Sequence, residues 1–219
     1  FAILLFIGPG ILFEHKIMHD FPYGYYSSDA FQHQIRAEAI KDAGNFMYEA
    51  PYISLGFEKA VGRYPPLIYH LAVMFSYASG LEVYDSIYFI VFFFVIMGIF
   101  VIYLVISDFN KNIALISLPL TMLTFTLPSL IGFLFGHWPS LLAQFFVIVF
   151  AWCLMRVDLE KSYILIGITF SSIILAHTSE AVFAVIFLLL FFIIKLLNKD
   201  FKKIEIKNVI IALVLSFIV

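Results

Sequence analysis

The sequence has 219 residues, of which 63% are hydrophobic and 13% are charged. A soluble domain carries about 25% charged residues, so this composition excludes an ordinary water-soluble fold and predicts a membrane protein. The net charge of −2 gives no basic surface for nucleic acid, and the one cysteine excludes a disulfide framework or a cysteine metal site within the chain.

The apolar runs predict an all-α, polytopic helical membrane protein with about seven spans, because a spanning helix needs about 20 apolar residues. We expect one transmembrane domain over residues 1–219. Since the chain opens and closes inside apolar runs, we expect it to be the N-terminal part of a longer protein. Pro119, Pro128 and Gly132 are expected to break one run. The runs are residues 1–13, 87–106, 113–135, 141–155, 163–176, 181–194 and 209–219.

Residues 28–44 have the apolar spacing of an amphipathic helix, with Phe31, Ile35 and Ala39 on one face, Ile40 and Ala43 widening that face, and Gly44 as its stop. Such a helix is expected to lie flat on the membrane, with this apolar face toward the lipid.

Asp29 opens this helix and has two interpretations. It is an N-cap, with Gln32 at the capping-box position, or it is a catalytic carboxylate at the membrane surface. In the second case His33 and Arg36 lie one turn further along the same helix. The two roles are compatible, because a cap fixes a carboxylate in place. The alternative for Arg36 is the solvated face of the helix.

Residues 66–80 form a further apolar run, which holds His70. Five lysines lie between residues 195 and 207, and short cytoplasmic loops are enriched in lysine and arginine. The basic loops share one side of the bilayer if residues 66–80 do not cross it. We therefore expect residues 66–80 to form a helix half embedded in the outer face. Residues 14–85 then form the first extracytoplasmic loop, and all six histidines lie on the outer side.

The other polar candidates near this outer side each have two interpretations. Arg63 binds a phosphate or anchors the chain at lipid headgroups. Trp138, beside His137 in a short outer loop, stacks on a sugar or belongs to an aromatic belt.

Two further histidine positions have a metal or a capping interpretation. His15 and His19 lie four residues apart, which on a helix is the spacing of a metal pair, although histidines near a span end are often interfacial only. His177 precedes Thr178, the expected N-cap of the next span.

An apolar first span, Asp29 at the start of a horizontal helix, and Arg63-Tyr64-Pro65-Pro66-Leu67 before a helix that ends at Gly80 follow one another in the sequence. This order resembles the N-terminal half of the GT-C membrane glycosyltransferases over residues 1–110. That superfamily includes oligosaccharyltransferases, protein O-mannosyltransferases and aminoarabinose transferases. The resemblance implies transfer of a sugar from a polyprenyl-phosphate carrier to an acceptor on the extracytoplasmic side of the cell membrane.

The resemblance also implies roles for particular residues. Asp29 matches the main catalytic carboxylate. In oligosaccharyltransferases an acidic motif in the next outer loop binds a divalent metal, whereas residues 136–140 here hold a histidine and no acid. This departure favours the metal-independent branch, with no certain cofactor. The expected partners are the lipid bilayer, the polyprenyl-phosphate-linked sugar and the C-terminal part of the same protein.

The residue types suit this chemistry, because transfer needs a base, a cation for the leaving phosphate and an apolar groove for the lipid. Two other functions stay open: a transporter or flippase of a lipid-linked substrate, and a non-catalytic membrane subunit of the same fold. Transporters place ionisable groups near the bilayer midplane, and the predicted span interiors carry none. The predicted substrate-binding residues are His33, Arg36, Arg63, His70, His137 and Trp138.

Overall fold

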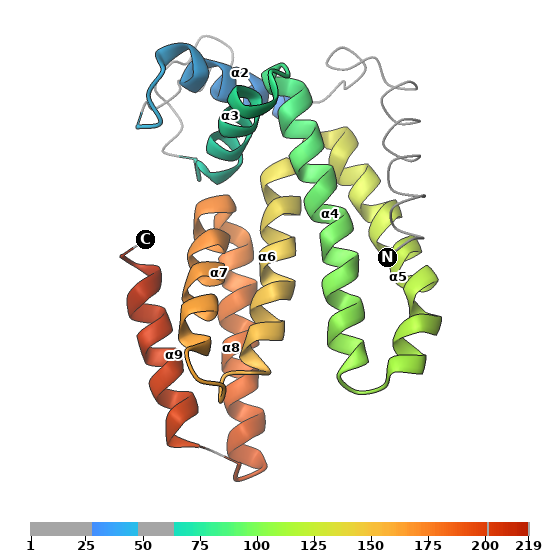
Figure 1. Ribbon diagram of the computed structural model, residues 1–219, viewed down its shortest axis with the longest axis vertical. Coiled ribbons are helices and arrows are strands. Elements are labelled where there is room, and N and C mark those ends of the chain that lie inside the picture. Colours follow the sequence, from blue (N-terminus) through green and yellow to red (C-terminus); the bar gives the residue numbers. More distant parts are fainter. Residues whose placement is uncertain (1–27, 48–63, 201, 219) are drawn as a thin grey trace. The chain divides into compact units, whose positions relative to one another are not determined.

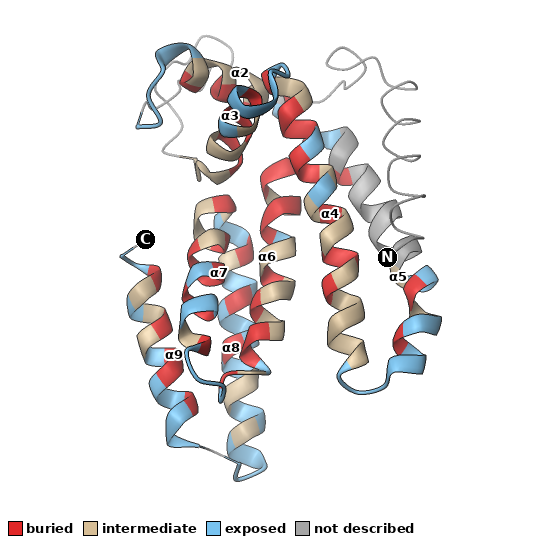
Figure 2. Ribbon diagram, in the orientation of Figure 1, coloured by how far each residue is buried: buried red, intermediate tan, exposed pale blue. Residues whose placement is uncertain are grey.

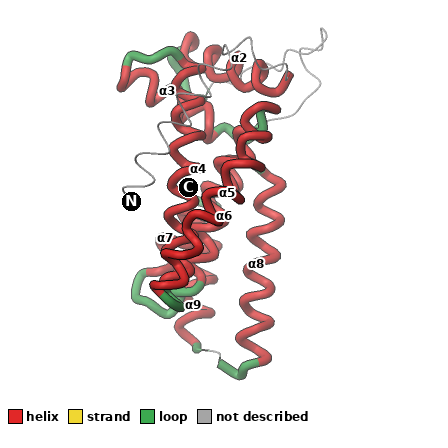
Figure 3. The backbone as a smooth tube through the Cα atoms, turned by 90° about the vertical axis from the view of Figure 1, so that its right-hand side faces the viewer, coloured by secondary structure: helices red, strands yellow, loops and turns green. Residues whose placement is uncertain are grey.

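The structure is a computed structural model that describes residues 28–47, 64–200 and 202–218 (Figure 1). The described part contains eight helices and no strand (Figure 3), which confirms the all-α prediction. The helices belong to two compact units, Phe1–Leu141 and Leu142–Val219. The first predicted run, residues 1–13, lies outside the described residues. For residues 28, 122–131, 133 and 134 the structure describes the backbone only.

Two described helices are long and apolar enough to cross a membrane, α4 (Val83–Ser107) and α8 (Thr178–Leu197). Only 33% of the most apolar stretch of α4 and 17% of that of α8 is buried inside the protein, whereas the core helix of a soluble protein is mostly buried. The helices α3 (Leu67–Ser79), α6 (Trp138–Leu154) and α7 (Ser162–Ala176) are apolar but shorter than 18 residues. The predicted count of seven spans is therefore not confirmed.

In the first unit, α4 and α5 (Lys111–Phe135) pack side by side in opposite directions (Figure 1). Asn110 ends the turn between them. Its Oδ1 accepts hydrogen bonds from the backbone N–H groups of Asn112 and Ile113 at 2.9 and 3.1 Å. These donors would otherwise lack partners at the helix start, so the side chain of Asn110 fixes where α5 begins.

The predicted break within α5 is wrong, because the helix continues through Pro119, Pro128 and Gly132. A proline inside a helix removes one backbone hydrogen bond, but most helical stability comes from packing against neighbouring elements. Leu118 of α5 packs against the buried Ile99 of α4. This contact, directly beside the first proline, offsets the lost hydrogen bond.

The helix expected over residues 66–80 is confirmed as α3, which has 13 residues. At 1.5 Å per residue it is about 20 Å long, shorter than the hydrocarbon core of about 30 Å. Gly80 ends the helix with a left-handed φ of 75°, and its N–H donates to the carbonyl of Ser76. The helix is therefore too short to cross a bilayer, and its position at the outer face stays a prediction.

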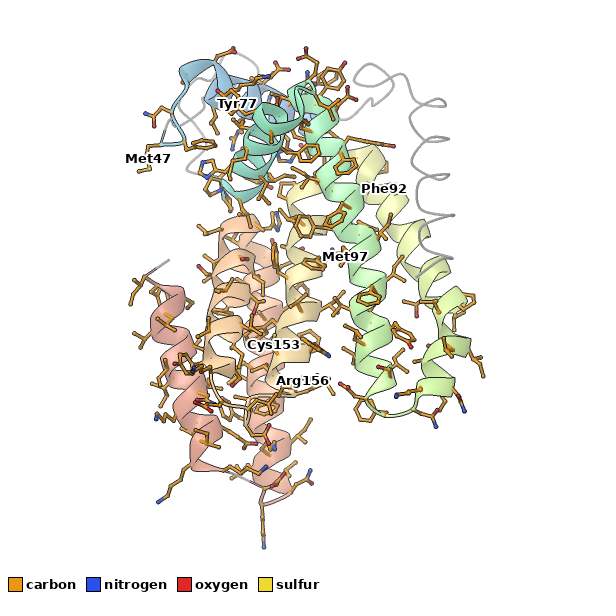
Figure 4. The ribbon with its side chains drawn as sticks, viewed as in Figure 1. Met47, Tyr77, Phe92, Met97, Cys153 and Arg156 are labelled. Atoms are coloured by element: carbon orange, nitrogen blue, oxygen red, sulfur yellow. The ribbon has the colours of Figure 1, made fainter. Side chains whose placement is uncertain are left out.

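Helices α2 (Ser28–Ala43) and α3 are tied together by three side-chain hydrogen bonds. Nδ1 of His33 lies 2.8 Å from the hydroxyl of Tyr69, and Nζ of Lys41 donates to Oγ of Ser76 at 2.9 Å. The hydroxyl of Tyr77, a residue labelled in Figure 4, donates to the carbonyl of Lys41 at 3.0 Å. The partners are 36, 35 and 36 residues apart. Because this offset is nearly constant, the two helices run in the same direction.

Helix α6 begins in the first unit and continues into the second after Leu141. In the second unit this part of α6, α7, α8 and α9 (Lys203–Ser216) run up and down as a bundle (Figure 1). Their shared core includes Phe150, Ile166 and Ile173. Helices α7 and α9 approach closely at Gly167, where a Cβ atom would lie 3.0 Å from the carbonyl oxygen of Ala212. Figure 2 shows many exposed positions along α8, most of which are apolar.

Asn208 of α9 holds the turn between α6 and α7. Its buried Nδ2 donates to the carbonyl of Val157 at 2.6 Å and to Oγ of Ser162 at 3.1 Å. A buried side-chain amide needs such partners, because leaving it unpaired costs about 1–3 kcal/mol. The start of α9 and the α6–α7 turn are therefore fixed to each other.

The basic loop predicted between residues 195 and 207 is shorter than expected. Helix α8 continues to Leu197 and α9 begins at Lys203, so three of the five lysines lie on helices. The last turn of α8 and the first turn of α9 are helical because charged side chains pair between them. Nζ of Lys195 lies 2.8 Å from Oε1 of the buried Glu205.

Candidate functional site

Asp29 lies in the first turn of α2, and its side chain is exposed. Because the helix begins at Ser28, Asp29 lies inside the first turn instead of at the cap position, which falls outside the described residues. A carboxylate in the first turn is still favoured by the helix dipole. The sequence thus correctly predicts a carboxylate at the helix start, but not its cap position.

Gly136, between α5 and α6, lies directly against this first turn. Its φ of +77° is left-handed, and a Cβ atom there would lie 2.4 Å from the backbone nitrogen of Ala30 and 2.9 Å from the carbonyl carbon of Asp29. Only glycine permits both features. The two predicted outer loops therefore meet at Asp29, and the exposed His137 follows one residue after the contact.

His33 and Arg36 belong to a cluster of five side chains, four buried and one (Tyr64) half-buried, which we call the His33 cluster: His33, Arg36, Tyr64, Tyr69 and Trp138. His33 and Arg36 are 6% and 5% exposed, and Trp138 is fully buried. The His33 ring centroid lies 5.4 Å from that of Tyr64, 5.8 Å from that of Tyr69 and 6.1 Å from that of Trp138. Cζ of Arg36 lies 5.1 Å from the centroid of Tyr64, a cation–π distance.

Tyr69 is the hydrogen-bonding centre of the His33 cluster. Burial raises the pKa of its phenol above the ordinary value, and the nearby charge of Arg36 only partly opposes this. The phenol therefore keeps its proton and can donate it to Nδ1 of His33, 2.8 Å away. In that tautomer His33 is neutral and carries its own proton on Nε2.

Replacing Tyr69 with phenylalanine is expected to destabilise the protein by about 1–3 kcal/mol, because the buried Nδ1 of His33 loses its partner. Tyr77→Phe is the matched control, since the Tyr77 side chain is exposed and water can replace its bond to the carbonyl of Lys41. Chemical unfolding of the purified protein in detergent measures both losses. Equal losses would show that the Tyr69 hydroxyl is not part of a buried network.

The face of α2 that packs within the protein is not the predicted apolar face. Its buried residues include His33, Arg36 and Ala37, whereas of the predicted apolar face only Ile40 is buried and Phe31 is 38% exposed. The solvated-face alternative for Arg36 is therefore wrong. The face with Phe31 points away from this packing, and its contact with lipid stays a prediction.

The remaining predicted site residues do not join the His33 cluster. His137 is exposed, and its ring lies 6.3 Å from that of Phe135. His70 packs edge-on against Phe46, with ring centroids 5.4 Å apart. Arg63 lies outside the described residues.

Sequence reasoning missed three residues that build this region: Tyr64, Tyr69 and Gly136. His70 is the predicted substrate-binding residue of α3, but Tyr69, one position earlier and about 100° around the helix, contacts His33 instead. Gly136 had a recognisable signal, because a glycine directly after a helix usually adopts a left-handed conformation. No comparable signal marks Tyr64, whose role depends on tertiary packing.

A second polar pair lies at the turn between α7 and α8. Thr178 is the first residue of α8 and His177 occupies the cap position with an extended backbone, so the predicted Thr178 cap is wrong. Nδ1 of His177 pairs with the carboxylate of the buried Glu180. This local pair explains why the chain turns at His177.

Among the described residues, no group of three or more His, Cys, Asp or Glu side chains could hold a metal ion. His15 and His19, the predicted metal pair, lie outside those residues. The chain matches no protein family model, no curated protein and no solved structure. The resemblance to GT-C enzymes therefore depends on the sequence motifs alone.

Proposed function

We propose that this protein is a polytopic membrane glycosyltransferase of the GT-C type, which moves a sugar from a polyprenyl-phosphate carrier to an acceptor at the outer face of the cell membrane. The observation that carries the proposal is the contact of Gly136 with the first turn of α2. It joins two segments that lie 106 residues apart in sequence, Ala30 and Gly136, and so gives the exposed Asp29 a fixed backbone position.

Asp29 is the catalytic base in this proposal. The acceptor hydroxyl gives its proton to the Asp29 carboxylate while its oxygen bonds to the anomeric carbon of the sugar. The bond between that carbon and the phosphate oxygen breaks, and the lipid phosphate leaves with the electron pair. A positioned base of this kind contributes about 10²–10⁴-fold to a rate.

The buried residues act by positioning, since His33, Arg36 and Trp138 are enclosed by protein. They hold α2 against α3 and against the start of α6, which keeps Asp29 in place. The guanidinium of Arg36 also adds a fixed positive potential near the leaving phosphate. Arg63, next to Tyr64 in sequence, is the proposed direct phosphate ligand, because guanidinium binds phosphate with two parallel hydrogen bonds.

His70 and His137 are the proposed contacts with the sugar, because neither side chain is enclosed in the His33 cluster. The apolar outer surface of α4, which includes Phe89 and Phe93 at 40% and 46% exposure, is suited to the prenyl chain of the donor. The same exposed surfaces on α4 and α8 support a location within the bilayer.

The substitution Asp29→Asn tests whether Asp29 is the catalytic base. Membranes that contain the protein are incubated with a panel of radiolabelled polyprenyl-phosphate sugars, and the label released from the lipid is counted. Asp29→Asn is expected to lower the transfer rate by at least about 100-fold. Asp42→Asn, which removes an exposed carboxylate from the other end of the same helix, is expected to leave it unchanged.

Two results would contradict the proposal. Equal rates for the two variants would show that Asp29 is not the base. Binding of a labelled donor without any transfer by the unaltered protein would instead identify a non-catalytic membrane subunit.

A further inference from the structure

The second unit has a lysine-rich end, which holds the α6–α7 turn and the further extended α8–α9 turn (Figures 1 and 3). Nζ of Lys202 joins the two turns through a 3.2 Å ion pair with Oδ2 of Asp158. The hydrogen bond from Lys202 lowers the pKa of the Asp158 carboxyl. The Asp158 carboxyl is therefore ionised at neutral pH, and its pair with Lys202 holds the turns together.

Most acids at this end are already paired inside the unit. Nζ of Lys195 lies 2.8 Å from Oε1 of Glu205 and 3.2 Å from Oδ2 of Asp200. Lys195 and Lys202 are thereby paired with three acids, which leaves one negative charge in excess among these pairs. Glu160 is the remaining acid of the α6–α7 turn, and its side chain is exposed.

Four exposed lysines at this end have no ion pair with any residue that the structure describes. They form what we call the basic end: Lys161, Lys199, Lys203 and Lys207. Glu160 and the excess acid of the paired groups together carry two negative charges, so the four lysines still leave a net positive surface. Arg156, labelled in Figure 4, adds a fifth positive charge at the end of α6, where it lies 4.1 Å from the ring centroid of Trp152.

The exposed stripe of α9 changes from charged to apolar within two turns. Lys203, Lys207, Ile210 and Val214 follow one another at intervals of three or four residues, and all are exposed. The opposite side of the helix, which includes Asn208, is buried. A helix that passes from lipid headgroups into hydrocarbon has this sequence of side chains on its outer face.

Helix α8 also has exposed apolar and charged side chains next to each other, but here the apolar ones come first along the chain. Leu196 and Leu197 are 66% and 75% exposed, and Lys199 follows them directly (Figure 2). The basic end is thus bordered by exposed apolar side chains on both of its helices. A protein partner that only recognised charge would not need this apolar border, whereas a bilayer surface supplies both a charged and an apolar layer.

The lysines are also poorly placed for the stability of α9. Lys203 is the first residue of α9, where the positive end of the helix dipole disfavours a cation, and Lys207 follows one turn later. An external anion close to these turns would offset the repulsion between the lysines and the helix dipole, because its charge is opposite to that of the basic end.

We propose that the basic end binds the headgroups of anionic phospholipids in the bilayer leaflet on its side. The ammonium groups contact the lipid phosphates, and Leu196, Leu197 and Ile210 contact the acyl chains. Lys202–Asp158 keeps the two turns in register, so that lysines from both turns act on one lipid patch. This binding does not depend on sugar transfer or on Asp29.

The test uses the purified full chain in a neutral detergent with phosphatidylglycerol and phosphatidylcholine in equal amounts. Native mass spectrometry counts the lipids of each kind that stay bound. The unaltered protein is expected to retain phosphatidylglycerol in excess. Lys203→Gln/Lys207→Gln is expected to lower that preference about 30-fold, which corresponds to about 1 kcal/mol per lysine near an anionic surface.

Lys41→Gln/Lys111→Gln is the matched control, because it removes the same charge from the first unit and is expected to keep the preference. Raising the salt concentration toward 1 M, where the screening length falls to about 3 Å, is expected to abolish the preference. Equal retention of the two lipids by the unaltered protein, or the same preference in both double variants, would overturn the proposal. Circular dichroism establishes that both variants keep their helix content.

Discussion

Alanine at position 136 is expected to destabilise the first unit far more than alanine at position 80. Both glycines have a left-handed φ, +77° and +75°, and a side chain in that conformation costs about 1–3 kcal/mol. At Gly80 an added Cβ meets nothing within 4 Å, whereas at Gly136 it lies 2.4 Å from the nitrogen of Ala30. The difference between the two variants therefore isolates the close contact with α2.

Thermal unfolding of the purified protein in detergent measures this difference. The fluorescence of Trp138, read in a Trp152→Phe background because the sequence has two tryptophans, reports whether the contact has opened. Gly136→Ala is expected to shift the Trp138 emission to longer wavelength, and Gly80→Ala is not. Equal midpoints for the two variants would mean that the loop and α2 are not held at this distance.

The sequence predicts helices well here, because long apolar runs can satisfy their backbone hydrogen bonds in lipid only as helices. Residues 87–106 and 181–194 correspond to α4 and α8, each of which extends beyond its run by several residues. The ends are less predictable, because a helix continues into polar sequence when its side chains find partners. Lys195 and Glu205 form such a pair, and neither the apolar pattern nor the charge pattern indicates it.

The candidate site is predicted in part, because helical spacing puts Asp29, His33 and Arg36 on one side of α2. Spacing cannot tell whether that side faces water, lipid or protein. His33 and Arg36 face protein because Tyr64, Tyr69 and Trp138, which come from distant parts of the sequence, pack around them. The sequence therefore predicts the chemical groups, whereas tertiary packing decides which of them are exposed.

Trp138→Ala is expected to lower the free energy of unfolding by about 3–5 kcal/mol, the usual loss for a large aromatic side chain in a core. Trp138 is 0% exposed and lies 6.1 Å from His33 between ring centroids, so its removal leaves a cavity beside a buried polar pair. The surroundings cannot collapse into this cavity easily, because Gly136 already fixes the backbone two residues earlier. Chemical unfolding in detergent measures the loss.

Trp138→Phe and Trp152→Ala separate the possible causes of that loss. Phenylalanine keeps a ring in contact with His33 and is expected to retain most of the stability. Trp152 is only half-buried, with the guanidinium of Arg156 over its ring, so Trp152→Ala is expected to cost less. If both alanine variants lost the same free energy, the buried Trp138 would contribute no more to stability than the half-buried Trp152. A larger loss at Trp138 that phenylalanine reverses would instead show that the His33 cluster is the packed support on which the position of Asp29 depends.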